Sequence, residues 1–316
     1  MTYAQYGLVE ASDYNNLVGT NPGTGANKLN TVWAVGGGSA GYGQTAITNV
    51  SAGNTVTAAQ WNNVITNTAS AASHQGSSIT SVAARVVGGT ITYLSAIPTN
   101  LTTIYSNRLN ATAQGSTTSN SVTRGSTWSS ALTYTHTITF SSGDTARYFF
   151  NSGGQIAMTV SHPAGSGING TFSGLASNIG TVVLSAPTSG SITVSAVSYN
   201  GVTKIGGGGN SPTISPNNGY FALTTSNANV FTQTASGGYY GYNNSFIRFI
   251  VKSNGTQGSN SDAGSIITIY TVWDEVPDGQ IVSSGSVTTC TIRPPSTTYI
   301  ANTWGSIGLS GAVSGS

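Results

Sequence analysis

The sequence predicts a mainly β protein. A region of short helices and glycine-rich loops, residues 1–115, precedes an antiparallel β-sandwich or jelly-roll-like domain, residues 116–316. Three observations predict this fold class: a ten-residue pattern that occurs twice near the N-terminus, an alternation of apolar and polar residues after residue 116, and a charged fraction of only 5%. Short alternating runs between turn-forming residues are typical of sandwiches.

The repeated pattern is Val9–Val18, which recurs as Val56–Ile65. Both copies keep an aromatic residue, two asparagines and an aliphatic pair. In the second copy, Thr57 and Gln60 have the spacing of a capping box, in which each residue bonds the main chain of the other at a helix start. Both copies therefore predict helix starts that support one assembly region, with the residues Tyr14, Asn15, Asn16, Trp61, Asn62 and Asn63.

Three helices are expected in the first region, over residues 10–19, 57–73 and 100–113. The third is indicated by apolar residues at helical spacing shortly after Pro98. The segment 47–56 either pairs as a strand or wraps around the helices. Helices this short, joined by glycine-rich loops, suit a docking or trimerising module better than a free-standing domain.

Ten strands are expected in the second region, because apolar residues alternate there between Gly, Asn, Ser and Pro turns. The runs 246–251 and 266–273 are the most apolar, so they are predicted to be central strands. The full set is 131–140, 144–151, 155–162, 191–199, 219–225, 230–234, 246–251, 266–273, 287–293 and 300–309.

The composition excludes several classes of function. The formal net charge is +2 with no basic cluster, so no nucleic-acid partner is expected. No run approaches the roughly 18 apolar residues of a membrane span, and the N-terminus does not look like a secretory signal. The single cysteine, Cys290, excludes an intrachain disulfide and a cysteine-built metal site.

We expect no catalytic residues, no metal site and no cofactor. His74, His136 and His162 are far apart and have no metal-ligand spacing. We interpret His136 as a partly buried strand residue and His74 as a cation at the negative end of a helix. Asp274 and Glu275 are adjacent, and adjacent strand residues point to opposite faces, so they make a poor acid–base pair.

One loop is a candidate contact surface. Tyr239, Tyr240 and Tyr242 lie among glycines in an uncharged segment. Tyrosines on such a loop can stack on sugar rings or anchor a protein contact at low entropic cost. Both interpretations remain open, and a subunit interface is favoured because the chain has so few charges.

Two blocks of sequence resemble virion structural proteins of tailed bacteriophages, particularly phages of marine bacteria and cyanobacteria. The first block comprises the two helix-start patterns, Gly41–Gln44 and His74–Gln75. The second comprises Thr137–Phe140 followed by Asp144–Ile156. After Gly206 the likeness fades.

The resemblance implies a structural component of the phage particle, a homo-oligomeric tail or neck fibre or appendage. It would be assembled in the host cytoplasm and bound to other virion proteins. The low charged fraction and the apolar runs separately predict an oligomer of identical chains, and we interpret residues 1–115 as the module that makes it a trimer. Three alternatives remain open: a carbohydrate-binding adhesin that recognises a host surface glycan, a capsid decoration protein, and an envelope-degrading enzyme, which turnover of host polysaccharide would identify. The resemblance brings no catalytic residues.

Overall fold

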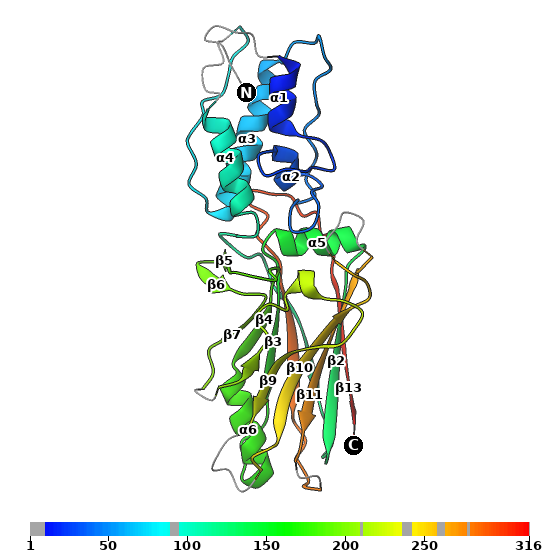
Figure 1. Cartoon of the computed structure of the whole chain (residues 1–316). Helices are drawn as coiled ribbons and strands as arrows, with labels where there is room; N and C mark the ends of the chain where they lie inside the picture. The colour runs from blue at the N-terminus through cyan, green and yellow to red at the C-terminus, as the bar shows by residue number, and fades with distance from the viewer. Residues whose placement is uncertain are drawn as a thin grey trace.

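The computed structural model describes residues 10–88, 95–208, 211–235, 242–257, 263–276 and 279–315. The chain forms two parts that follow one another along a long axis (Figure 1). Helices α1–α4 occupy one end, and two antiparallel β-sheets occupy the other. We call residues 10–106 the head and the two packed sheets the sandwich. The fold is therefore mixed α/β, with more helix than the mainly β class that we predicted.

The described residues of the head form four helices: α1 (Ala11–Val18), α2 (Leu29–Trp33), α3 (Ala58–Gln75) and α4 (Ala96–Ser106). The helices predicted over 10–19 and 57–73 are confirmed. The predicted third helix was misplaced: α4 begins at Ala96, so Pro98 lies in its first turn, where a missing N–H is tolerated. The five-residue α2 was not predicted, and residues 47–50 wrap without forming a strand.

The larger sheet of the sandwich has the order β13-β2-β11-β10-β9-β8 and the smaller has the order β1-β12-β3-β4-β7. Every neighbouring pair is antiparallel. The strands are β1 (Thr118–Thr123), β2 (Ala131–Thr139), β3 (Gln155–Ser161), β4 (Thr181–Leu184), β7 (Val202–Ile205), β8 (Thr213–Ile214), β9 (Ala228–Thr234), β10 (Phe246–Ser253), β11 (Ile266–Asp274), β12 (Val287–Arg293) and β13 (Gly308–Gly315).

The strands β10 and β11 are interior strands of the larger sheet, as predicted from their apolar content. In both, every second residue is buried between the sheets and the others are half-buried on the outer face. The apolar runs are thus accommodated inside one chain. They do not by themselves require a second copy.

Several predicted strands were wrong. Residues 144–151 form helix α5 (Gly143–Asn151), because Ser142 and Thr145 make a capping box: the Thr145 N–H donates to Ser142 Oγ at 3.1 Å. Residues 219–225 contain the 3₁₀ turn Tyr220–Ala222 instead of a strand. The run 191–199 is a hairpin of β5 (Ile192–Val194) and β6 (Val197–Tyr199).

The last predicted strand, 300–309, overlaps β13 only at its end. The preceding residues lie where the head meets α5: Thr303 donates to the Tyr42 carbonyl, the Trp304 ring packs on Phe149, and Ile300 and Trp304 are buried. Helix α6 (Gly167–Ile179) was also missed. Across the described residues, no helix is both long and apolar enough to span a bilayer.

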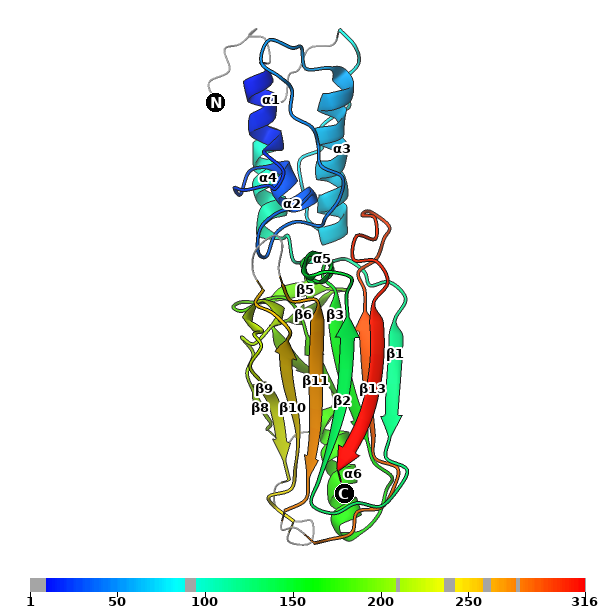
Figure 2. The ribbon, with the colours of Figure 1, turned by 90° about the vertical axis from the view of Figure 1, so that its right-hand side faces the viewer.

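One continuous cluster of buried side chains runs from Tyr14 in the head to Trp304 beside α5. Figure 2 shows α5 lying across the end of the sandwich, directly beneath the head. The two parts therefore share a core.

Candidate functional site: amide clamps and the junction of head and sandwich

The two copies of the repeat pack against each other. Tyr14 of α1 and Trp61 of α3 are completely buried, with ring centroids 6.4 Å apart. Burial raises the pKa of Tyr14. Among the described residues, neither the Tyr14 hydroxyl nor the Trp61 indole nitrogen has a hydrogen-bond partner. These rings therefore contribute apolar packing to the head.

The helix starts are capped as the spacing predicted. At α3, the Gln60 N–H donates to Thr57 Oγ1 at 3.2 Å, and the Thr57 N–H donates to Gln60 Oε1 at 2.9 Å. At α1, the Glu10 N–H donates to Asp13 Oδ2 at 3.2 Å. Each cap satisfies main-chain groups that a helix end leaves open.

The first asparagine of each repeat holds a distant main-chain segment by two hydrogen bonds. Asn15 accepts from the Val50 N–H and donates to the Val50 carbonyl, both at 2.8 Å. Asn62 accepts from the Arg85 N–H at 2.7 Å and donates to the Arg85 carbonyl at 2.9 Å. The repeat thus conserves a contact as well as a sequence pattern within this chain.

The other two head helices make the same contact. Asn30 of α2 holds both main-chain groups of Ile47 at 2.9 Å. Asn100 of α4 accepts from the Thr80 N–H at 3.0 Å and donates to the Thr80 carbonyl at 2.8 Å. We call these four side chains, Asn15, Asn30, Asn62 and Asn100, the amide clamps. A primary amide presents one acceptor and donor N–H groups side by side, so it can replace a neighbouring strand at one residue.

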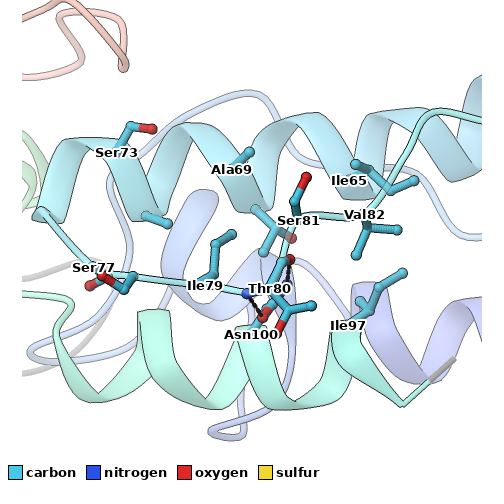
Figure 3. A pocket seen from close by; sticks show the side chains of 13 residues that line it. Ile65, Ala69, Ser73, Ser77, Ile79, Thr80, Ser81, Val82, Ile97 and Asn100 are labelled. Carbon is cyan, nitrogen blue, oxygen red and sulfur yellow. Dashed lines mark hydrogen bonds between the residues drawn. The ribbon is translucent and has the colours of Figure 1, made fainter. Parts of the chain in front are cut away.

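Each segment has two clamped residues, Ile47 and Val50 in one and Thr80 and Arg85 in the other. In both segments the two clamped residues are an odd number of positions apart. In an extended chain, such residues direct their main-chain groups to opposite sides. This is the arrangement that a segment between two helices needs. Figure 3 shows residues 77–82 lying between α3 and α4, where they border an open groove of about 430 Å³.

The second asparagine of each repeat has a different place. Asn16 and Asn63 are exposed. Lys28 Nζ donates to the main-chain oxygen of Asn16. Asn63 lines an open groove of about 480 Å³ together with Tyr14 and Trp33. The six predicted residues therefore divide into two buried rings, two clamps and two surface amides.

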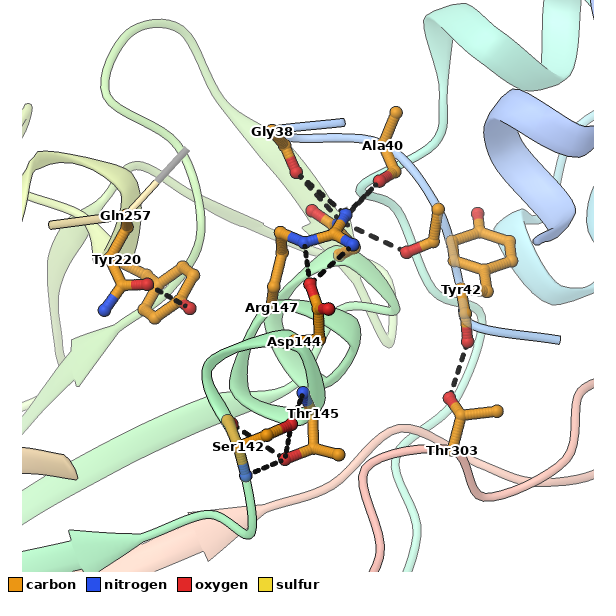
Figure 4. A network of polar contacts seen from close by, with 12 residues as sticks. Gly38, Ala40, Tyr42, Ser142, Asp144, Thr145, Arg147, Tyr220, Gln257 and Thr303 are labelled. Atoms are coloured by element: carbon orange, nitrogen blue, oxygen red, sulfur yellow. Dashed lines mark hydrogen bonds and ion pairs between the residues drawn. The ribbon is translucent and has the colours of Figure 1, made fainter. Parts of the chain in front are cut away.

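Arg147 of α5 fastens the sandwich to the glycine-rich loop of the head (Figure 4). Its side chain is completely buried and pairs with Asp144 at 3.0 Å. Its Nη1 donates to the Ala40 carbonyl at 2.7 Å. Asn151, one helical turn further on, donates to the carbonyls of Ala40 and Gly41 at 3.0 and 3.1 Å. The junction is therefore built from side chains of α5 and main chain of the loop.

Two glycines shape this junction, Gly41 by closing the loop on itself and Gly43 by letting the loop approach α5. Gly41 has a φ of +96°, and a Cβ there would lie 2.3 Å from the main-chain nitrogen of Gly36. Gly43 has a φ of +69°, and its Cβ would lie 2.5 Å from the Tyr148 ring. Both positions combine a left-handed conformation with contact distances that exclude a side chain.

A second set of contacts crosses the junction. Gln75 donates to the buried Tyr42 hydroxyl at 2.7 Å, which in turn donates to the Arg108 carbonyl at 2.8 Å. Gln44 holds both main-chain groups of Ala301 at 2.9 Å. Gln44 thus repeats the amide-clamp contact between the head and the C-terminal segment.

His74 lies in the last turn of α3, as predicted, but not as a cation. It is buried, its Nε2 lies 3.0 Å from the Ser152 carbonyl, and its ring packs on Tyr42. Burial lowers its pKa to about 4. The predicted favourable charge at the helix end was therefore wrong, because burial penalises the charged form more than the helix dipole favours it.

The other two histidines lie inside the sandwich. His136 is completely buried, more deeply than predicted, and burial lowers its pKa. The ring of His162 links Ser286 Oγ, 3.0 Å from Nδ1, to Asn169 Oδ1, 3.2 Å from Nε2. This hydroxyl–imidazole–amide chain resembles the layout of a catalytic triad.

A nucleophile must be accessible to its substrate, and Ser286 is not. It has no exposed surface, and its hydroxyl also accepts from the Trp128 indole at 3.3 Å. Asn169 in addition accepts from the Ser283 N–H at 2.8 Å. This hydrogen-bonded chain therefore connects α6 to the turn before β12. The sequence spacing of these residues does not predict the contact.

The remaining candidates for chemistry are dispersed. Glu275 is buried and its Oε2 accepts from the Gln280 N–H at 3.3 Å, whereas Asp274 is half-exposed at the end of β11. Cys290 is completely buried, and burial raises its pKa to about 12. In the described part of the chain, no cluster of His, Cys, Asp and Glu has the makings of a metal site.

The tyrosine loop is described only at its end. Tyr239 and Tyr240 lie outside the described residues. Tyr242 is half-buried against the core, and its hydroxyl donates to Gln280 Oε1 at 3.1 Å. Only its exposed part is available to a ligand or a partner.

Comparisons with protein-family models, with curated proteins and with solved structures gave no match.

Proposed function

We propose that the protein is a structural component of a tailed-phage virion, a homo-oligomeric tail or neck appendage assembled in the host cytoplasm. The observation that carries this proposal is the junction. A buried arginine, a buried asparagine and a glutamine clamp join the head to the sandwich without a flexible linker. An element that transmits force along a particle needs such a rigid joint. The resemblance of the two sequence blocks points in the same direction.

In this proposal the head is the attachment end, the sandwich projects, and the strand connections are jelly-roll-like. The segment that ends at Gly88 returns to the head's far end, where α3 begins (Figure 1). Val86 and Val87 are 74% and 95% exposed there. Adjacent exposed valines suit a contact with another virion protein.

The alternative of an adhesin without chemistry depends on the loop with Tyr239, Tyr240 and Tyr242. The half-buried Tyr242 next to Gln280 offers an aromatic face beside an amide. A glycan-binding screen with a triple-alanine variant tests this alternative. Loss of a glycan signal in the variant would support it, and the absence of any signal in the wild type would remove it.

The main test has two parts. Mass measurement in solution should give a multiple of the 31.9 kDa subunit, with three copies expected. Antibody labelling of intact particles should then place the protein on the tail or neck. Labelling spread over the capsid would favour a decoration protein instead.

The attachment end can be tested with matched variants. Val86→Ser with Val87→Ser should reduce incorporation of the protein into particles. Val197→Ser is the control, because Val197 is 42% exposed on the β5–β6 hairpin of the sandwich. Equal incorporation of both variants would contradict attachment through the head.

A further inference from the structure

One long edge of the sandwich carries two open strands. Among the described residues, β1 pairs only with β12 and β13 pairs only with β2, so within that part of the chain each has one side without a paired strand. The two strands belong to different sheets yet lie next to each other at the same edge, and both run away from the head (Figure 2). A Cβ on Gly311 of β13 would lie 2.4 Å from Asn120 Oδ1 of β1. This edge is therefore closely packed within the chain but open to the outside.

The open strands lack the features that usually block edge pairing. Neither contains a charged residue or a proline: β1 reads TSNSVT and β13 reads GLSGAVSG. An edge strand exposes unpaired N–H and C=O groups, and natural proteins commonly protect such strands with charges, prolines or shortness. β1 and β13, six and eight residues long, have none of these.

The opposite edge is protected. There β8 has two residues, and β7 has four and contains Lys204. The difference between the two edges indicates that the β1/β13 edge is kept available for pairing.

The rest of the described surface offers little else for self-association. Its exposed large hydrophobic side chains are Val86, Val87, Val197, Ile281 and Tyr299, and only the two valines are adjacent in sequence. Among the residues that the structure describes, an oligomer therefore has little apolar surface to bury. Main-chain pairing between strands is the remaining strong contact.

We propose that β13 of one copy pairs in parallel with β1 of a second copy, in a closed ring of copies whose heads point the same way. This inference rests on the proposed homo-oligomer. The occupant is a second copy because each chain carries both halves of the contact at one edge. A two-fold contact between two β13 strands would leave β1 open, whereas a cyclic contact satisfies both strands in every copy.

Single introduced cysteines test this arrangement, because Cys290 is completely buried and leaves the wild type as a clean control. One chain carries Ser121→Cys, whose native hydroxyl faces outward and meets Thr289 Oγ1 at 2.8 Å. A second chain carries Ser310→Cys, Ala312→Cys or Ser314→Cys, three exposed positions on one face of β13 that sample the register. The two chains are produced together and treated with a short bis-maleimide.

The expected result is a species of twice the subunit mass in at least one mixture, and none with either chain alone. Links between β13 cysteines alone would show a two-fold contact and overturn the proposal, as would no link in any mixture. Thr213→Cys on β8, mixed with Ser121→Cys, is the control at the opposite edge.

The mass of the wild type in solution distinguishes a failure of the edge pairing from a failure of the proposed assembly. An oligomeric wild type that gives no link between β1 and β13 overturns only the edge pairing. A wild type that remains monomeric overturns both the edge pairing and the proposed assembly.

Discussion

In the sandwich, strands pair with strands, whereas in the head the extended segments are held by asparagine side chains. β2, for example, is paired along its length with β11 on one side and β13 on the other. The segments 47–50 and 80–85 instead have an amide clamp at each end. The two regions therefore differ in how strongly their hydrogen bonds depend on the identity of single side chains. A strand ladder survives most surface substitutions, but a clamp disappears with one side chain.

The largest expected loss of stability comes from removing a buried tryptophan, and we expect the same loss in the head and in the sandwich. Trp61 of the head and Trp273 of the sandwich are both completely buried. Each change to alanine should lower the free energy of unfolding by about 3–5 kcal/mol. Denaturant unfolding followed by fluorescence and by circular dichroism measures this. A Trp61→Ala protein as stable as the parent would show that the packing of the two repeats is incidental.

Acid should weaken the junction through His74. Its pKa is about 4 when folded and 6.5 when unfolded, so the unfolded chain binds the extra proton first. Stability from this group is complete above about pH 6.5 and is lost as the pH falls towards 4, on the order of 3 kcal/mol in all. Burial of His136 and His162 acts in the same direction.

The variant His74→Gln isolates this contribution, because glutamine can still donate to the Ser152 carbonyl. We expect the free energy of unfolding, measured at pH 7, 6, 5 and 4, to fall less with decreasing pH in the variant than in the wild type. Identical pH dependence in both proteins would assign the acid sensitivity to other groups.

The clamps give the sharpest contrast with the strands. Asn62→Ala should cost about 1–3 kcal/mol, because it leaves the Arg85 main chain without its partner. The exposed neighbour Asn63→Ala should stay within about 0.5 kcal/mol. In hydrogen exchange, the Arg85 amide should lose protection only in the first variant.

A matched change in the sandwich is Thr135→Ala on β2, whose main chain faces Tyr270 and Ala312. Amide exchange across β2 and β11 should be unchanged, because the ladder uses no side chain. Exchange that rises as much as in Asn62→Ala would remove the distinction between the two regions.

The smallest effect is expected for Tyr14→Phe. The buried Tyr14 hydroxyl has no hydrogen-bond partner among the described residues, so its loss removes no bond. The free energy of unfolding should change by less than about 0.5 kcal/mol, with a gain favoured over a loss. A loss well above that range would reveal a bound partner for the hydroxyl, such as an ordered water.

Capping boxes and apolar alternation in the sequence were sufficient to place some of the helices and strands. The capping box at Thr57 placed the start of α3, and alternation placed β2, β10, β11 and β12. The same kind of signal was available at Ser142 and Thr145. There the apolar run within residues 144–151 predicts a strand, but the cap prevails and helix α5 forms.

The sequence by itself determined that the chain would have capped helices first and alternating strands after them, because caps and periodicity act over a few residues. Only the tertiary structure decided which main-chain segments Asn15 and Asn62 hold, since their partners lie 35 and 23 residues away. It also decided that Arg147 and His74 are buried at one junction, and that β1 and β13 share an open edge. These contacts join residues that are far apart in the chain, and their free energies depend on burial and on packing, neither of which local patterns specify.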